Sequence, residues 1–77
     1  MVKNSNYSET FGSYIRKIRI QNSIGQRELA KKISIAPSYL NDMEKDKRAA
    51  PKNELIKKLS NILKVDLKKL YDLAGNS

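Results

Sequence analysis

Apolar residues recur along the chain at the spacing of one helix face, and no stretch alternates with the period of a β-strand. Between residues 11 and 18 the apolar positions are Phe11, Tyr14, Ile15 and Ile18. This i, i+3, i+4, i+7 pattern is typical of an amphipathic helix. Ser8 or Thr10 is suited to cap its start, and we expect it to end near Asn22.

A short second helix is predicted from Gln26 to Ile33, after Gly25 breaks the first pattern. Leu29 and Ile33 lie four residues apart on its buried side. Ala30 is small enough for another helix to approach it closely.

The third helix is predicted from Pro37 to about Lys45, because proline has the backbone angle of a first helical position. Residues 34–36 form the connection to it, and Leu40 and Met43 are expected to be buried.

The last third of the chain carries the strongest helical pattern. After Pro51, a fourth helix is marked by Leu55, Ile56, Leu59, Ile62 and Leu63. Asp66 is expected to cap a fifth helix, with Leu67, Leu70 and Tyr71, and Gly75 to end it. The prediction is an all-α, compact five-helix domain over residues 9–75, preceded by a disordered polar arm at residues 1–8.

Composition excludes most catalytic and metal chemistry. The 77 residues contain no cysteine and no histidine, which removes disulfides, Cys/His zinc sites, thiol nucleophiles and imidazole acid/base groups. No arrangement of the remaining polar residues singles out an active site, so we expect a protein that is not an enzyme and needs no cofactor or metal. Without an apolar run of membrane-spanning length or a signal peptide, we expect a cytoplasmic location and no membrane partner.

The chain is strongly basic, with 16 Lys and Arg against 8 Asp and Glu and a formal net charge of +8. Such a charge favours a phosphate-rich partner. A lysine-rich surface that only keeps the protein soluble remains an equal alternative from charge alone.

Three segments in sequence order decide between these alternatives. They are residues 26–30 (QRELA), 38–44 (SYLNDME) and 55–65. Their order and spacing resemble the Cro/repressor-type (Xre) helix-turn-helix family, over roughly residues 11–73. The resemblance implies a helix-turn-helix formed by the second and third helices, with helix 37–45 in the major groove of double-stranded DNA. It further implies a sequence-specific transcriptional regulator, a repressor acting as a homodimer on a palindromic site.

The resemblance also implies which side chains meet the bases. The candidates for base readout are Pro37, Ser38, Asn41 and Asp42. Ser38 can donate to or accept from any base, Asn41 can pair with adenine or a phosphate, and Asp42 can accept from cytosine N4. Pro37 can only touch a thymine methyl group. Since this face lacks a bidentate Arg or Gln, we expect DNA shape to contribute to specificity.

Phosphate contacts are expected from Gln26 at the start of the second helix and from basic residues around the third. The candidates are Gln26, Arg27, Lys45, Lys47, Arg48 and Lys52. Lys52 is placed towards the minor groove by the resemblance. Lysines on the last two helices, at positions 57, 58, 64, 68 and 69, are expected to form a solvated face instead.

A partly buried salt bridge between Arg19 and Glu44 is implied by the same resemblance. Four positions depart from the family pattern: Gly25, Ser34, Ala36 and Asp46 stand where Ser or Thr, Gly, a capping residue and Gly are usual. Alanine in place of a capping residue costs about 0.5–2 kcal/mol, and serine held at a positive φ costs about 1–2 kcal/mol.

Two other kinds of binding protein remain as alternatives. One is a helical module whose basic surface meets an acidic protein. The other binds RNA or single-stranded nucleic acid, although the few aromatic residues fit helix faces better than a stacking platform. Within the preferred class, a phage-type repressor, a mobile-element regulator and an antitoxin all fit the sequence.

Overall fold

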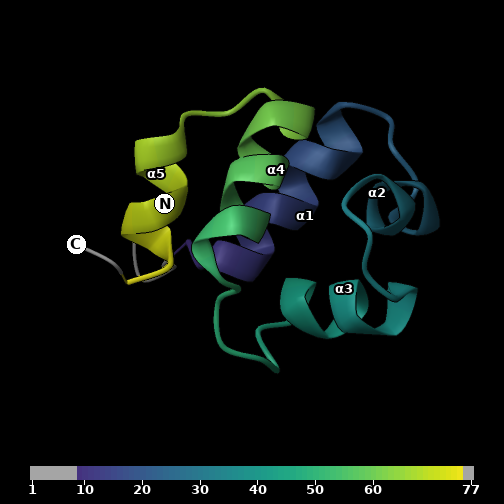
Figure 1. The fold of residues 1–77 in the computed structure, drawn as a ribbon, viewed down its shortest axis with the longest axis horizontal. Helices are drawn as coiled ribbons and strands as arrows, with labels where there is room; N and C mark the ends of the chain where they lie inside the picture. Colours follow the sequence, from purple (N-terminus) through teal and green to yellow (C-terminus); the bar gives the residue numbers. More distant parts are fainter. Residues whose placement is uncertain (1–8, 76–77) are drawn as a thin grey trace, which may run out of the picture.

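The computed structural model describes residues 9–75, which form five helices and contain no strand (Figure 1). The helices are α1 (Phe11–Gln21), α2 (Gln26–Lys32), α3 (Pro37–Glu44), α4 (Asn53–Leu63) and α5 (Leu67–Leu73). The all-α, five-helix prediction is therefore confirmed. The arm predicted for residues 1–8 lies outside the described residues.

Helix α3 lies along one edge of the molecule, where it packs against α1 and α2. Helices α4 and α1 run through the middle of the view, and α5 packs against α4 on the side away from α2 (Figure 1). The helix expected to enter DNA is therefore at an edge of the fold, with one side free of other helices.

Local side-chain chemistry sets where the helices begin. The Thr10 hydroxyl accepts a hydrogen bond from the Ser13 N–H at 3.1 Å, and the Ser13 hydroxyl oxygen accepts one from the Thr10 N–H at 3.0 Å. This reciprocal pair is a capping box. Thr10, one of the two predicted caps, therefore starts α1. Asp66 caps α5 as predicted, by accepting from the Lys68 N–H at 3.4 Å.

Left-handed residues set where several helices end. Ser34 and Asp46, the two positions where the family usually has glycine, have φ angles of 60° and 59°. Lys64, at the end of α4, has a φ of 58°. A non-glycine residue pays about 1–2 kcal/mol for this conformation. Helix α3 ends at Glu44, one residue earlier than predicted, because the chain turns at Asp46.

Every helix contributes to a single apolar core. The buried residues are Phe11, Ile15, Leu29, Ala30, Ile33, Leu40, Met43, Ile56, Leu59, Leu63 and Leu70. Ala30 is fully buried, as its small size predicted. In the described part of the chain, no helix is both long and apolar enough to cross a membrane.

Candidate nucleic-acid interface

The turn between α2 and α3 is short and rigidly built. The Ile35 N–H donates to the Ala30 carbonyl at 2.9 Å, and Ser34 supplies the left-handed residue. Ala36 caps α3 without a side-chain hydrogen bond, and Pro37 occupies the first turn. This places α3 at a defined angle to α2, although its own start lacks the usual polar cap.

The outer side of α3 carries the four residues expected to meet DNA bases. Pro37 and Ser38 are exposed, and Asn41 and Asp42 are partly exposed. Leu40, between them in sequence, is fully buried. The structure therefore brings the four candidates to the free side of the helix.

The basic loop after α3 folds back onto that helix. The Arg48 guanidinium lies 4.9 Å from the centre of the Tyr39 ring and 3.7 Å from an Asp42 carboxylate oxygen. The ion pair is partly exposed, so its contribution to stability is small. Its effect on the interface is larger, because Arg48 offsets the negative charge of Asp42 on a surface that would face phosphates. Neither contact was predicted from the sequence.

Arg19 and Glu44 form a buried ion pair beneath this surface. The Arg19 Nε lies 2.7 Å from one Glu44 oxygen and Nη2 lies 3.1 Å from the other. Nη1 donates to the Ile24 carbonyl at 2.8 Å. The two side chains are 12% and 2% exposed. The structure thus contains the pair that the resemblance implied, and its geometry is bidentate.

Gln26 contacts the same buried carboxylate. Its Nε2 lies 3.1 Å from Glu44 Oε1 and 3.4 Å from Asn41 Oδ1. The sequence suggested Gln26 only as a phosphate contact, and these two internal hydrogen bonds were missed. The pattern of α2 and α3 residues gives no sign of them, because they depend on how the helices cross.

The Asp46 carboxylate joins the end of α3 to the start of α1. It accepts a hydrogen bond from the Thr10 hydroxyl at 2.6 Å and from the Gly12 N–H at 3.0 Å. An anion is favoured at a helix N-terminus, where free N–H groups and the helix dipole both attract it. Asp46 is therefore more than a substitute for a turn glycine, since its side chain holds the basic loop against α1.

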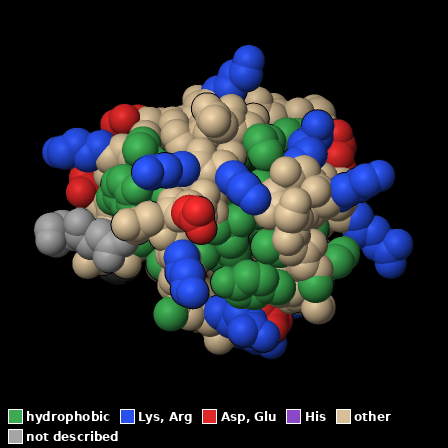
Figure 2. All heavy atoms as spheres, viewed as in Figure 1, with side chains coloured by type: hydrophobic (Ala, Val, Ile, Leu, Met, Phe, Trp, Pro, Cys, Tyr) green, Lys and Arg blue, Asp and Glu red, His purple; other side chains and the backbone are tan. Residues whose placement is uncertain are grey.

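The remaining phosphate candidates, which we call the basic rim, lie on α2 and on the segment between α3 and α4. Arg27, Lys45, Lys47 and Lys52 are all exposed. Lys52 is also the capping residue of α4, so it lies directly after the loop. Positive charge is not confined to this rim, because Figure 2 shows Lys and Arg side chains over the whole face in view.

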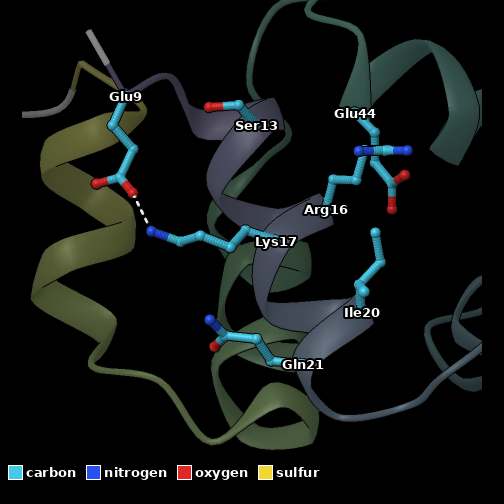
Figure 3. Close-up of a pocket in the computed structure, with 7 residues that line it drawn as sticks. All are labelled: Glu9, Ser13, Arg16, Lys17, Ile20, Gln21 and Glu44. Atoms are coloured by element: carbon cyan, nitrogen blue, oxygen red, sulfur yellow. Dashed lines mark hydrogen bonds and ion pairs between the residues drawn. The ribbon is translucent and has the colours of Figure 1, made fainter. Parts of the chain in front are cut away.

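A shallow pocket of about 440 Å³ lies on the outer side of α1 (Figure 3). Its lining includes Glu9 and Lys17 at one side, and Arg16, Ile20 and Glu44 at the other. Both of its carboxylates are already paired, Glu9 with Lys17 and Glu44 with Arg19. Within residues 9–75 no group of three or more acidic, His or Cys side chains is arranged to hold a metal ion.

An exposed helix set on a crossing helix, with hydrogen-bonding side chains outward and a basic rim, defines a helix-turn-helix DNA-binding domain. The chain matches the family model described as helix-turn-helix over residues 15–70, and it belongs to that family.

Solved structures similar to this chain include the master regulator for biofilm formation SinR in complex with DNA. That structure is 30% identical with a TM-score of 0.74, and the match covers 82% of this chain and 100% of that one. The N-terminal DNA-binding domain of SinR from Bacillus subtilis is 31% identical with a TM-score of 0.72, covering 80% and 90%. A complex of SinR with SinI is 30% identical with a TM-score of 0.73, covering 82% of this chain but 61% of that one. The chain thus spans less than two thirds of that last protein. No curated protein sequence matches this one.

Proposed function

We propose that this protein is a sequence-specific, double-stranded DNA-binding transcriptional repressor that inserts α3 into the major groove. The observation that carries the proposal is the free side of α3, where Ser38, Asn41 and Asp42 are accessible beside an exposed basic rim. Groove edges are recognised by such hydrogen-bonding groups, and phosphates by the rim. DNA bound to SinR, a protein of the same fold, supports this proposal.

The side chains divide into two roles. Pro37, Ser38, Asn41 and Asp42 contact base edges, while Arg27, Lys45, Lys47, Arg48 and Lys52 contact phosphates. Gln26 belongs to neither group. It is partly exposed at the start of α2 but is already hydrogen-bonded to Asn41 and Glu44 on α3. We propose that the protein has no enzymatic activity and acts in the cytoplasm. The proposed mode of action is repression, because a protein that occupies an operator is enough to exclude other proteins from the same DNA.

The test is selection of bound duplexes from a random pool. We expect one sequence to be enriched and then bound at least about a thousandfold more tightly than random duplex at physiological salt. Equal binding of both would favour the alternative, a basic protein-interaction module. Tighter binding of the same sequence as a single strand would favour the other alternative, a protein that binds RNA or single-stranded nucleic acid. The Ser38→Ala variant should enrich a different sequence, since Ser38 is assigned to the bases.

We further propose a homodimer on a palindromic site. Two-fold symmetric proteins of this class bind half-sites about one helical turn apart. Leu67 and Tyr71 on α5 are partly exposed apolar side chains and are the candidates for the contact between subunits. Inserting about 5 base pairs between the half-sites puts them on opposite sides of the duplex. We expect this to abolish cooperative binding, and unchanged cooperativity would contradict the dimer.

A further inference from the structure

A chain of hydrogen bonds runs from the buried ion pair to the outer side of α3. Glu44 accepts from Arg19 and also from Gln26 Nε2, at 3.1 Å. The same Gln26 nitrogen lies 3.4 Å from Asn41 Oδ1. The series therefore passes from α1 through the end of α3 and the start of α2, and returns to the middle of α3.

Each link in this chain has one possible direction. A carboxylate paired with arginine can only accept hydrogen bonds, so Gln26 must turn its amide nitrogen towards Glu44. That nitrogen carries two hydrogens, and the second is directed at Asn41. Only the Asn41 oxygen can accept it. The buried charge thereby sets which end of the Asn41 amide faces inward.

We infer that Gln26 is a specificity-determining residue that orients Asn41 so that its Nδ2 group, a hydrogen-bond donor, faces the DNA. This inference rests on the proposed function and deepens it. Bases that present acceptors in the major groove, guanine through O6 and N7 or thymine through O4, fit a donor. Cytosine presents its N4 amino group and is rejected. The two-bond pairing of asparagine with adenine is also weakened, because it needs the oxygen that is turned towards Gln26.

The same geometry alters the role expected for Gln26 itself. Both hydrogens of its Nε2 are engaged inside the protein, which leaves the side chain without a donor for a phosphate. Its neighbour Arg27 is exposed on the same turn of α2 and keeps its full charge for that contact. Loss of Gln26 should therefore change the base preference, whereas loss of Arg27 should weaken binding to every duplex. The two adjacent residues thus provide a variant and its matched control.

The test compares duplex selection for the wild-type protein and three variants. Asn41→Ala first identifies the base pair that Asn41 contacts, as the position where preference is lost. At that position we expect the wild type to prefer guanine or thymine over cytosine by about tenfold. Gln26→Met, which keeps the length of the side chain, should reduce this preference to within about threefold and leave the other positions unchanged. Arg27→Met should lower affinity for every duplex and keep the preference.

Several results would overturn the inference. It fails if Gln26→Met weakens all duplexes equally, which is the behaviour of a phosphate contact, or if it changes nothing. It also fails if the wild type prefers cytosine at the Asn41 position, or if Asn41→Ala alters no position. By contrast, a wild-type protein that binds selected and random duplexes equally would contradict the proposed function itself. Circular dichroism of each variant, with wild-type helix content expected, separates these results from unfolding. If Gln26→Met does not fold, Gln26→Leu serves instead, because it also lacks a donor for Asn41 and should likewise reduce the preference to within about threefold.

Discussion

Gly12 in the first turn of α1 lies directly against the carbonyl group of Met43 at the end of α3. A Cβ atom at Gly12 would overlap the Met43 carbonyl oxygen, and it would lie 2.8 Å from the Glu44 carbonyl oxygen and 2.7 Å from Asp46 Oδ1. Two of these three neighbours are backbone atoms. The close approach of α1 to the end of α3 therefore requires a residue without a side chain.

Replacing Gly12 with alanine should destabilise the fold. Because backbone carbonyls cannot swing aside as a side chain can, the helices must separate, and we expect a loss of about 1–3 kcal/mol. The free energy of unfolding in urea measures this loss. Gly25→Ser is the matched glycine control, since a Cβ there meets nothing within 4 Å and the hydroxyl adds a helix cap worth a few tenths of a kcal/mol. Equal stability of Gly12→Ala and the wild type would show that the contact can relax.

Asp46 offers a test of whether a strained backbone is outweighed by its side-chain contacts. Asp46→Gly relieves the left-handed conformation but removes the acceptor for Thr10 and Gly12. A hydrogen bond to a charged group contributes about 1.5–3 kcal/mol, against a strain of about 1–2 kcal/mol. Because two such hydrogen bonds are lost, we expect a net loss of at least about 1 kcal/mol in thermal or urea unfolding. Asp46→Asn, which keeps both a short polar side chain and tolerance for this conformation, should lose less. Greater stability of the glycine variant would mean that the strain is the larger effect.

Replacing only one partner of the Arg19–Glu44 pair should lower the free energy of unfolding more than replacing both partners together. Arg19→Met leaves a carboxylate that is 2% exposed without its ionic partner, and such a loss is typically about 3–5 kcal/mol. The double variant, Arg19→Met with Glu44→Met, should lose less than the sum of the two single variants. A double-mutant cycle by urea unfolding gives the coupling energy. Additive effects of the two substitutions would show that Arg19 and Glu44 do not stabilise each other.

Lysines on the rim and on the far helices should differ in their response to salt. Lys47→Ala should weaken all duplexes about equally and flatten the plot of log affinity against log salt by about one unit. Lys68→Ala, on the exposed side of α5, removes the same charge and should leave the slope unchanged. Titrations at several salt concentrations measure both slopes. If the two variants behaved alike, the rim would have no special role and binding would depend on net charge.

Acid should weaken one contact between the start of α1 and α5. The hydrogen bond from Lys17 lowers the pKa of the Glu9 carboxyl below its ordinary value of 4.5, and Lys69 contributes as well. A carboxyl whose pKa is lowered on folding stabilises the fold above its unfolded pKa, and this contribution is lost as the pH falls through the folded pKa. Glu9→Gln should therefore flatten the decline in unfolding temperature below about pH 4.5. Glu54→Gln, which removes one exposed negative charge on α4, is the control and should retain the wild-type decline.

Helix positions followed from the sequence because each helix buries one apolar face at regular spacing. Thr10 and Asp66 were correctly expected as caps, since capping depends on residues within the same turn. Ser34 and Asp46 were expected at positive φ because they replace glycines of the family pattern. The end of α4 was harder to predict from the sequence, because lysine is unusual in the left-handed conformation that Lys64 adopts there.

The parts of the interface that join distant segments were harder to predict. Gln26 contacts Glu44 across 18 positions of sequence, and Asp46 contacts Gly12 across 34. Such contacts depend on the crossing of helices, and neither hydrophobic spacing nor residue type specifies them. The contacts of Arg48 with Tyr39 and Asp42 likewise join the basic loop to α3, and neither was predicted.

Glu44 has a consequence for the thermodynamics of DNA binding. One carboxylate holds Arg19 from α1 and Gln26 from α2 while it is itself part of α3, so α3 and the two helices that pack against it are fastened at one point. A surface ordered in advance loses little conformational entropy when its partner arrives. Docking should then proceed as a rigid body, with a heat-capacity change no larger than the buried apolar area requires.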